Sequence, residues 1–114
     1  MPLNDTLLNV GANAMAGVAT HLSLATANPE PTGTNQATSA RVAAGWGAAA
    51  NGDLTVSNKA FTGGAANGPC TYLCFWSAVT GGTFYGSVAL TGDTTFNSAG
   101  EYTITSLTVN GSST

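Results

Sequence analysis

Residues 71–90 read TYLCFWSAVTGGTFYGSVAL, and this stretch decides the fold. Aromatic and β-branched residues fill both of its halves, which favours β-strands. Two adjacent glycines, Gly81 and Gly82, lie between the halves, and a short glycine connection of this kind is typical of a β-hairpin. We therefore expect two paired strands at 71–78 and 83–90, whose aromatic side chains supply most of the core.

Alternation of apolar and polar residues extends the strand pattern on both sides of the hairpin. Four further segments show the two-residue period of a strand: 20–26, 39–49, 53–62 and 102–109. The Asn-Gly pair at 51–52 predicts a second hairpin, between the middle two of these segments. Turn residues also occupy the gaps at 91–93 and 97–100. The spacing predicts six to eight short strands in total.

The segment 4–19 has the pattern of an amphipathic helix, because its apolar residues recur at spacings of three and four. Asn4 or Asp5 is available as its N-cap. Gly11 and Gly17 each weaken such a helix by roughly 1 kcal/mol relative to alanine, so we expect it to persist only when it is docked. The docking surface is either the sheet of its own domain or a partner subunit.

Together these patterns predict a mainly β protein: an antiparallel β-sandwich, jelly-roll or immunoglobulin-like, with one short N-terminal α-helix. The period changes from helical to alternating near Thr20. A chain of 114 residues is long enough for one core and too short for two. We therefore assign residues 1–19 to an N-terminal helix or arm and residues 20–114 to the sandwich domain.

The only histidine and the only arginine of the chain, His21 and Arg41, lie on either side of a polar loop at 28–38. In the strand before the loop, leucines alternate with His21 and Ser23, which predicts a half-buried strand. Two prolines and a glycine, with almost no bulky apolar residue, predict that the loop lies on the surface. We expect His21 and Arg41 to brace this loop, with Arg41 donating to loop carbonyls or to Glu30.

Few residues of the chain are charged: 6% of the total, with a formal net charge of −3. The two basic residues, Arg41 and Lys59, cannot form the basic face that nucleic acid or an anionic membrane surface requires. No apolar run approaches the ~18 residues of a spanning helix, and the amino-terminal residues lack the cationic leader of a secretory signal. We expect no nucleic-acid partner and no membrane partner. A weakly charged surface suits a subunit that its neighbours cover in an assembly.

The two cysteines, Cys70 and Cys74, are four residues apart in an expected strand. Strand geometry separates such residues by roughly 13 Å, well beyond the ~7 Å between the Cα atoms of a disulfide. We therefore expect two buried free thiols. Two cysteines and one distant histidine do not match the ligand spacing of a zinc site, so we expect no metal and no cofactor.

The sequence contains no motif that carries a catalytic mechanism. A Ser-His-Asp hydrolase built on His21 lacks the G-x-S-x-G elbow, and the five acidic residues are too scattered for a two-carboxylate glycosidase. We therefore expect no enzyme activity. Glycan binding remains an open alternative, because four aromatic side chains are available to stack on sugars: Tyr72, Trp76, Trp46 and Tyr85. Of these, we expect Trp46 and Tyr85 to be the residues that contact a partner. The exposure of Trp46 discriminates between stacking on sugars and packing in the core.

The run at 14–49 and the hairpin quoted above resemble a family of small tailed-phage virion proteins, variously labelled head decoration, minor tail or tail fibre proteins. In that family a short helix leads into a Gly-Val-Ala-Thr-His segment, a Thr/Gly/Asn loop, an arginine and a W-x-A segment. The matching positions here are Gly17 to His21, Gly33 to Asn35, Arg41 and Trp46. The closing residues FNSAGEYTITSLTV agree as well. The sequence departs from the family at Ala25 and Asn28, where His and Asp are common.

The resemblance implies a structural protein of the virion, assembled in the host cytoplasm together with other phage structural proteins, either the major capsid protein or a tail protein. We expect a homo-oligomer, a trimer, that decorates the capsid as a minor capsid protein. The single domain without a fibre repeat favours this placement. The alternative is a minor tail or tail-fibre protein that binds a glycan on the host surface.

Overall fold

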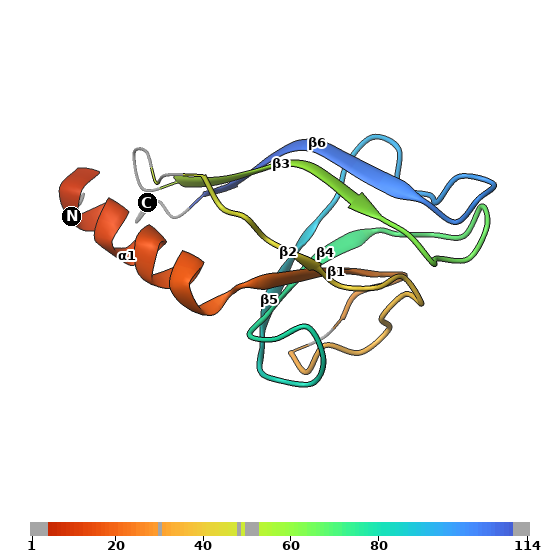
Figure 1. The fold of residues 1–114 in the computed structure, drawn as a ribbon, viewed down its shortest axis with the longest axis horizontal. Coiled ribbons are helices and arrows are strands. Elements are labelled where there is room, and N and C mark those ends of the chain that lie inside the picture. The colour runs from red at the N-terminus through yellow and green to blue at the C-terminus, as the bar shows by residue number, and fades with distance from the viewer. Residues whose placement is uncertain (1–4, 30, 48, 50–52, 111–114) are drawn as a thin grey trace.

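The chain folds into two antiparallel sheets that pack face to face, with one helix at the N-terminal end (Figure 1). The computed structural model describes residues 5–29, 31–47, 49 and 53–110. The elements are α1 (Asp5–Val18), β1 (His21–Ala25), β2 (Val42–Ala43), β3 (Asp53–Phe61), β4 (Tyr72–Trp76), β5 (Phe84–Ala89) and β6 (Tyr102–Asn110). One sheet has the order β2-β1-β4-β5 and the other pairs β3 with β6. The predicted antiparallel β-sandwich with one N-terminal helix is confirmed.

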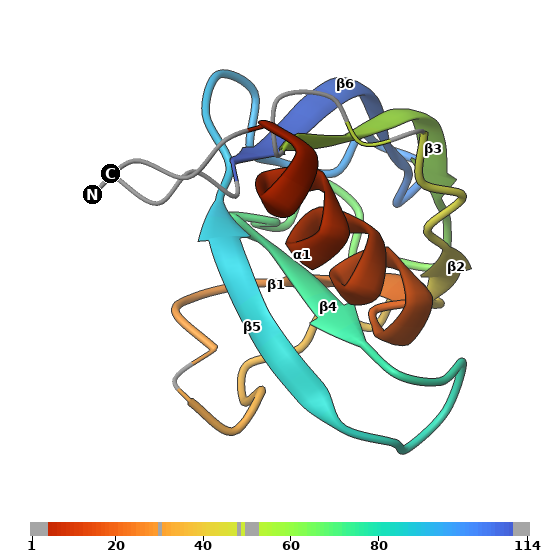
Figure 2. The ribbon, with the colours of Figure 1, turned by 90° about the vertical axis from the view of Figure 1, so that its left-hand side faces the viewer.

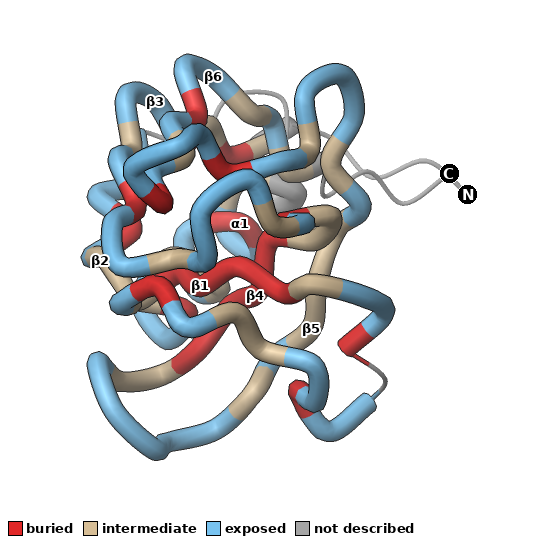
Figure 3. Tube along the Cα trace, turned by 90° about the vertical axis from the view of Figure 1, so that its right-hand side faces the viewer, coloured by how far each residue is buried: buried red, intermediate tan, exposed pale blue. Residues whose placement is uncertain are grey.

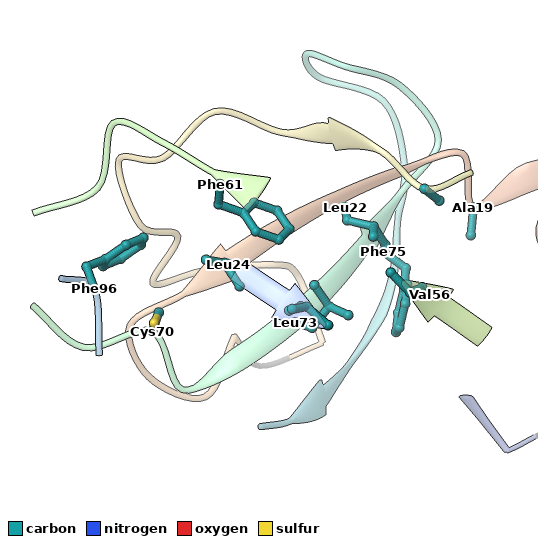
Figure 4. Packing of buried hydrophobic residues seen from close by; sticks show 11 residues of the cluster. Ala19, Leu22, Leu24, Val56, Phe61, Cys70, Leu73, Phe75 and Phe96 are labelled. Carbon is teal, nitrogen blue, oxygen red and sulfur yellow. The ribbon is translucent and has the colours of Figure 1, made fainter. Parts of the chain in front are cut away.

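The main core fills the space between the two sheets (Figure 4). Leu22 and Leu24 of β1 lie opposite Phe75 and Leu73 of β4 in the antiparallel register. The second sheet covers these side chains with residues that are themselves almost fully buried: Val56, Phe61 and Ile104. The even-numbered residues of β1 and the odd-numbered residues of β4 thus form one continuous apolar layer.

The central strands β1 and β4 are buried on both faces, so the prediction that the strand at 20–26 is half-buried was wrong (Figure 3). Ser23 points away from the main core but is only 3% exposed. The residues of β1 and β4 on that face, Ala25, Cys74 and Trp76, form a second, smaller cluster, and Phe84 packs against it. A strand that is covered on both sides can bury a polar residue only if that residue finds a hydrogen-bond partner.

The hairpin predicted at 71–90 is confirmed. The described segments on either side of 51–52 do not form paired strands, although Gly47 N donates one 3.2 Å hydrogen bond to Thr55 O between them. β4 and β5 pair in register from Tyr72↔Ala89 onward, with a bulge at Phe75/Trp76. In contrast, β2 pairs with β1, and β3 pairs with β6 along nine residues of chain. Asn51 and Gly52 themselves lie outside the described residues.

Helix α1 docks on its own domain through one face (Figure 2). Ala12 and Ala19 are buried, and Met15 packs against the main core. At the C-terminal end of the helix, the indole Nε1 of Trp46 donates a 2.8 Å hydrogen bond to the carbonyl of Ala19. The predicted N-cap at Asn4 lies outside the described residues. No described helix is long and apolar enough to cross a bilayer.

We predict that Phe61→Ala lowers the free energy of unfolding by about 3 to 5 kcal/mol, because Phe61 is fully buried at the centre of the core and alanine leaves a cavity. Urea unfolding followed by tryptophan fluorescence measures the change. Phe61→Leu fills more of the space and should recover part of the loss. An unchanged unfolding midpoint for Phe61→Ala would contradict the placement of this side chain.

Candidate functional site

Arg41 is hydrogen-bonded to the β4–β5 loop, whereas the sequence suggested the loop at 28–38. Its Nη1 atom donates 2.8 Å hydrogen bonds to the carbonyl oxygens of Ala78 and Gly81. Its guanidinium carbon lies 3.8 Å from the centre of the Trp76 ring, close enough for a cation–π contact. Arg41 thus braces the hairpin turn at 77–83. Glu30, the other expected partner, lies outside the described residues.

His21 also belongs to the end of the sheet near the hairpin turn. The Oγ1 atom of Thr20 donates to the carbonyl of Ser77 at 3.0 Å and lies 3.0 Å from His21 Nδ1. His21 therefore helps to orient the threonine that holds the start of the turn.

The loop at 28–38 is held by a chain of buried polar side chains that sequence reasoning missed. Trp76 Nε1 donates to Ser23 Oγ at 2.8 Å, and Ser23 Oγ donates in turn to Gln36 Oε1. The amide of Gln36 then reaches Cys74 Sγ at 3.4 Å. Ser23, Cys74 and Trp76 lie on the second face of the β1–β4 pair, so Gln36 fastens the loop over that face. The chain provides the partner that buried Ser23 requires.

Gly33 brings the same loop into direct contact with Trp76. Its backbone has a φ of 81°, and a Cβ atom built there would lie only 2.8 Å from the Trp76 ring. A larger residue would therefore be strained by its backbone and would also collide with the ring. Within the same loop Pro29 is fully buried. The loop covers the sheet with these two residues, while most of its other described residues are exposed, as its composition predicted.

Three of the four aromatic residues considered for sugar stacking are engaged in packing. Trp46 is half-buried, and its ring stacks on that of Phe75 with 5.9 Å between the ring centroids. Its indole nitrogen donates the hydrogen bond to the Ala19 carbonyl at the end of the helix. Trp76 is 8% exposed, and Tyr72 packs against the smaller cluster. Tyr85 differs from them, because 47% of its surface is exposed. The partial burial of Trp46 therefore favours packing in the core over stacking on sugars.

Two open grooves of contrasting chemistry lie on the surface. An apolar groove of about 400 Å³ lies between α1 and β5, with Met15, Val18, Phe75 and Tyr85 among its walls. A polar groove of about 360 Å³ lies over the turns before β6 and includes Asp93. The Oδ1 atom of Asp93 accepts from Thr95 N and Thr95 Oγ1, so this carboxylate serves the local turn. Among the described residues no three His, Cys, Asp or Glu side chains gather as metal ligands would.

Both cysteines are buried free thiols, as the strand spacing predicted. Burial raises the pKa of Cys70 from 9.0 to about 11, and the negative charge of Asp93 adds to the shift. Burial also raises the pKa of Cys74, although the hydrogen bond from Gln36, the neighbouring Ser23 hydroxyl and the charge of Arg41 act in the opposite direction. The thiolate form that reacts with disulfides and metals is therefore disfavoured at both positions.

The sequence of the chain matches a known protein family. Residues 3–112 match the family described as Podophage GP4 fiber I protein gp80. The chain belongs to this family of phage virion proteins. The matched residues extend over the helix, the loop at 28–38 and both sheets. No curated protein and no solved structure matches the chain. The protein is thus a structural component of a bacteriophage virion.

We predict that native Cys70 and Cys74 react slowly with a thiol reagent at pH 8 and that both react at once in denaturant, since their pKa values are raised and both are buried. The folded pKa of Cys70 exceeds the unfolded value, so its contribution to stability is complete below pH 9 and is lost as pH rises towards 11. Thiol titration with and without denaturant measures the reactivity. Rapid native labelling would show that the strand burial is wrong.

We predict that Arg41→Ala lowers the free energy of unfolding by about 1 to 3 kcal/mol, because it removes two hydrogen bonds from a charged donor and leaves two carbonyls without that partner. Arg41→Lys retains the charge and should lose less. Urea unfolding of the three proteins provides the comparison. Identical midpoints for wild type and Arg41→Ala would remove Arg41 from the bracing of the turn.

Proposed function

We propose that the protein is a subunit of a fibre-type appendage on the phage virion and that it functions as a homo-oligomer, a trimer. The observation that carries this proposal is the family match, whose description names a fibre protein and which spans residues 3–112. Because the matched region includes both α1 and the sandwich, the helix is part of the family domain. Its neighbours are other phage structural proteins, and assembly takes place in the host cytoplasm.

Capsid decoration, which the sequence favoured, is the second candidate. The chain measures 45 × 27 × 22 Å, which is compact for a protein that would extend a fibre by itself. A compact sandwich also suits a minor capsid protein seated on the major capsid protein. The two candidates differ in where the subunit attaches and in the number of copies on each particle.

We propose a structural role without catalysis, without a cofactor and without nucleic-acid or membrane partners. Arg41, one of only two basic residues, is engaged with carbonyls of its own chain. His21 orients Thr20 at the hairpin turn, and the thiols are buried. The described residues that were considered for a chemical role thus have structural partners or are buried.

A host-surface glycan is the third partner to consider, and it fits the fibre placement. Among the four candidate rings, Tyr85 is the one that the structure leaves largely exposed. One exposed ring supports only a weak sugar contact, because stacking platforms combine rings with convergent polar groups. Glycan binding is therefore subordinate to the structural role in this proposal.

The placement is tested by labelling intact particles with an antibody raised against this protein and imaging them by electron microscopy. We expect a few labelled positions that coincide with appendages. Labels distributed over the whole head would favour capsid decoration and overturn the fibre placement. Label that is absent from intact particles, with positive labelling of the purified protein as a control, would contradict any exposed position on the virion.

A further inference from the structure

Two surface grooves meet along strand β6. The polar groove that includes Asp93 has a volume of about 360 Å³, and a second groove has a volume of about 160 Å³. The two grooves share Thr91, Tyr102 and Thr103 as walls. Together they form one trench, called the β6 trench below, which is lined by residues of the segments 90–97 and 101–107. An elongated trench of this kind suits a chain-like ligand better than a compact one.

The lining of the β6 trench is rich in side chains that bind hydroxyl groups. Asp93, Asn97 and Glu101 supply two carboxylates and an amide at one end. Tyr102 adds an aromatic ring where the two grooves meet. Hydroxyl groups line much of the remainder, from Thr91, Thr95, Thr103, Thr105 and Ser106. Most ligand sites are lined mainly by apolar side chains, so this excess of polar groups favours a ligand that is itself covered with hydroxyls.

Each carboxylate of the trench has one oxygen available for a ligand. Asp93 Oδ1 accepts from the backbone and the hydroxyl of Thr95, whereas Asp93 Oδ2 has no hydrogen-bond partner among the described residues. Glu101 Oε1 accepts from Asn97 Nδ2 at 3.4 Å, and Glu101 Oε2 likewise has no partner in the described part of the chain. A carboxylate oxygen is a strong acceptor for a ligand hydroxyl, because a hydrogen bond to a charged group is stronger than a neutral one.

The walls of the trench are ordered by contacts within the chain. Tyr102 Oη donates a 2.7 Å hydrogen bond to the carbonyl of Asp93. The Tyr102 ring also makes an edge contact with Phe96, with 6.5 Å between the ring centroids. Asn97 Oδ1 accepts from Glu101 N at 3.0 Å. Because these side chains are already held, binding a ligand costs little further conformational entropy.

The charge of the trench favours a neutral ligand. Asp93 and Glu101 line it, and neither of the two basic residues of the chain, Arg41 and Lys59, is among its lining residues. Phosphate groups and acidic polysaccharides would therefore be repelled. A calcium ion fits poorly, because it takes about six to eight oxygen ligands. Among the described residues no three His, Cys, Asp or Glu side chains gather to supply them.

We propose that the β6 trench is a binding site for a neutral glycan chain. Asp93, Asn97 and Glu101 exchange hydrogen bonds with sugar hydroxyls at one end, and the threonine hydroxyls continue these contacts along β6. The ring of Tyr102 offers a packing surface between the two ends. The site is separate from Tyr85, which lines the apolar groove beside α1. Its use in contact with the host surface rests on the proposed fibre placement, whereas the binding itself does not.

The test follows the backbone amide signals of the full ¹⁵N-labelled chain by NMR during titration with neutral sugars. The probes are short linear oligosaccharides of glucose, of galactose and of N-acetylglucosamine. At least one of them should shift the signals of residues 90–97 and 101–107 selectively and saturably, with a dissociation constant in the millimolar range or tighter. The absence of such shifts with every probe at its solubility limit would overturn the proposal.

Asp93→Asn is the most specific variant for this site. The amide oxygen of asparagine can still accept from Thr95, while an NH₂ group replaces the carboxylate oxygen that is available to the ligand. We expect the dissociation constant to rise at least about tenfold. Asp53→Asn is the matched control, because it makes the same chemical change at the start of β3, outside the trench, and should leave the constant unchanged. Equal losses in both variants would contradict the site.

A second pair of variants keeps the test decisive if Asp93→Asn does not fold. Thr103→Val removes a hydroxyl from both grooves and retains the β-branched shape that suits a strand. Thr108→Val is its control, since Thr108 is exposed on the same strand and does not line the trench. Weaker sugar binding by Thr103→Val alone would support the proposal, and unchanged binding by both variants would overturn it.

Further probes distinguish the other occupants of the trench. If calcium chloride alone shifts the same signals and the neutral sugars do not, the trench is a cation site and the proposal fails. Tighter binding of an oligomer of galacturonic acid than of any neutral probe would overturn the neutral specificity.

Failure of this site is distinguishable from failure of the proposed function. If no sugar binds while antibody labels the appendages of intact particles, the trench proposal fails and the fibre placement stands. If sugar binds while the label covers the head, the site stands and the fibre placement fails.

Discussion

The rest of the structure depends on one constraint: β1 and β4 are covered on both of their faces. The second sheet covers one face with Val56, Phe61 and Ile104, and the loop at 28–38 covers the other. A strand pair enclosed in this way needs a partner for each polar group it buries. Ser23 finds its partners in Trp76 and Gln36. Because Gln36 belongs to the loop at 28–38, its hydrogen bond to Ser23 holds this polar loop against the sheet.

Local signals predicted most of the fold, and tertiary pairing decided the remainder. The helix and the β4–β5 hairpin follow from periodicity and from Gly81 and Gly82, which act within a few residues. The Asn-Gly pair at 51–52 is an equally clear turn signal, yet β3 pairs with a strand far along the chain because that pairing builds the second sheet. Arg41 was expected to donate to loop carbonyls, but the hairpin turn that supplies them was missed, because the sequence does not show which carbonyls lie near a side chain. Gln36 was missed because an amide in a loop is normally solvated.

The proposed virion role draws its physical support from the distribution of charge, more than from any single residue. Apart from Asp5 and Glu30, the basic and acidic side chains occur at 41–59 and 93–101, whereas the helix beyond Asp5 and all four strands of the larger sheet carry none. Helix α1 docks through Ala12, Met15 and Ala19 and turns its valines outward. One face of α1 therefore packs on the core of its own domain, and the opposite face presents exposed valines.

The long-range pairing of β3 with β6 has a consequence for the order of folding. Phe61 pairs with Tyr102 and Asp53 pairs with Asn110, so β3 has no sheet partner until the ribosome has delivered β6. Until then Leu22, Leu24, Leu73 and Phe75 lack the layer that covers them. Contacts between such distant segments form slowly, because a long loop must close before any stabilisation is gained. A newly made subunit thus passes through an interval with an open apolar sheet, and during that interval premature association competes with folding.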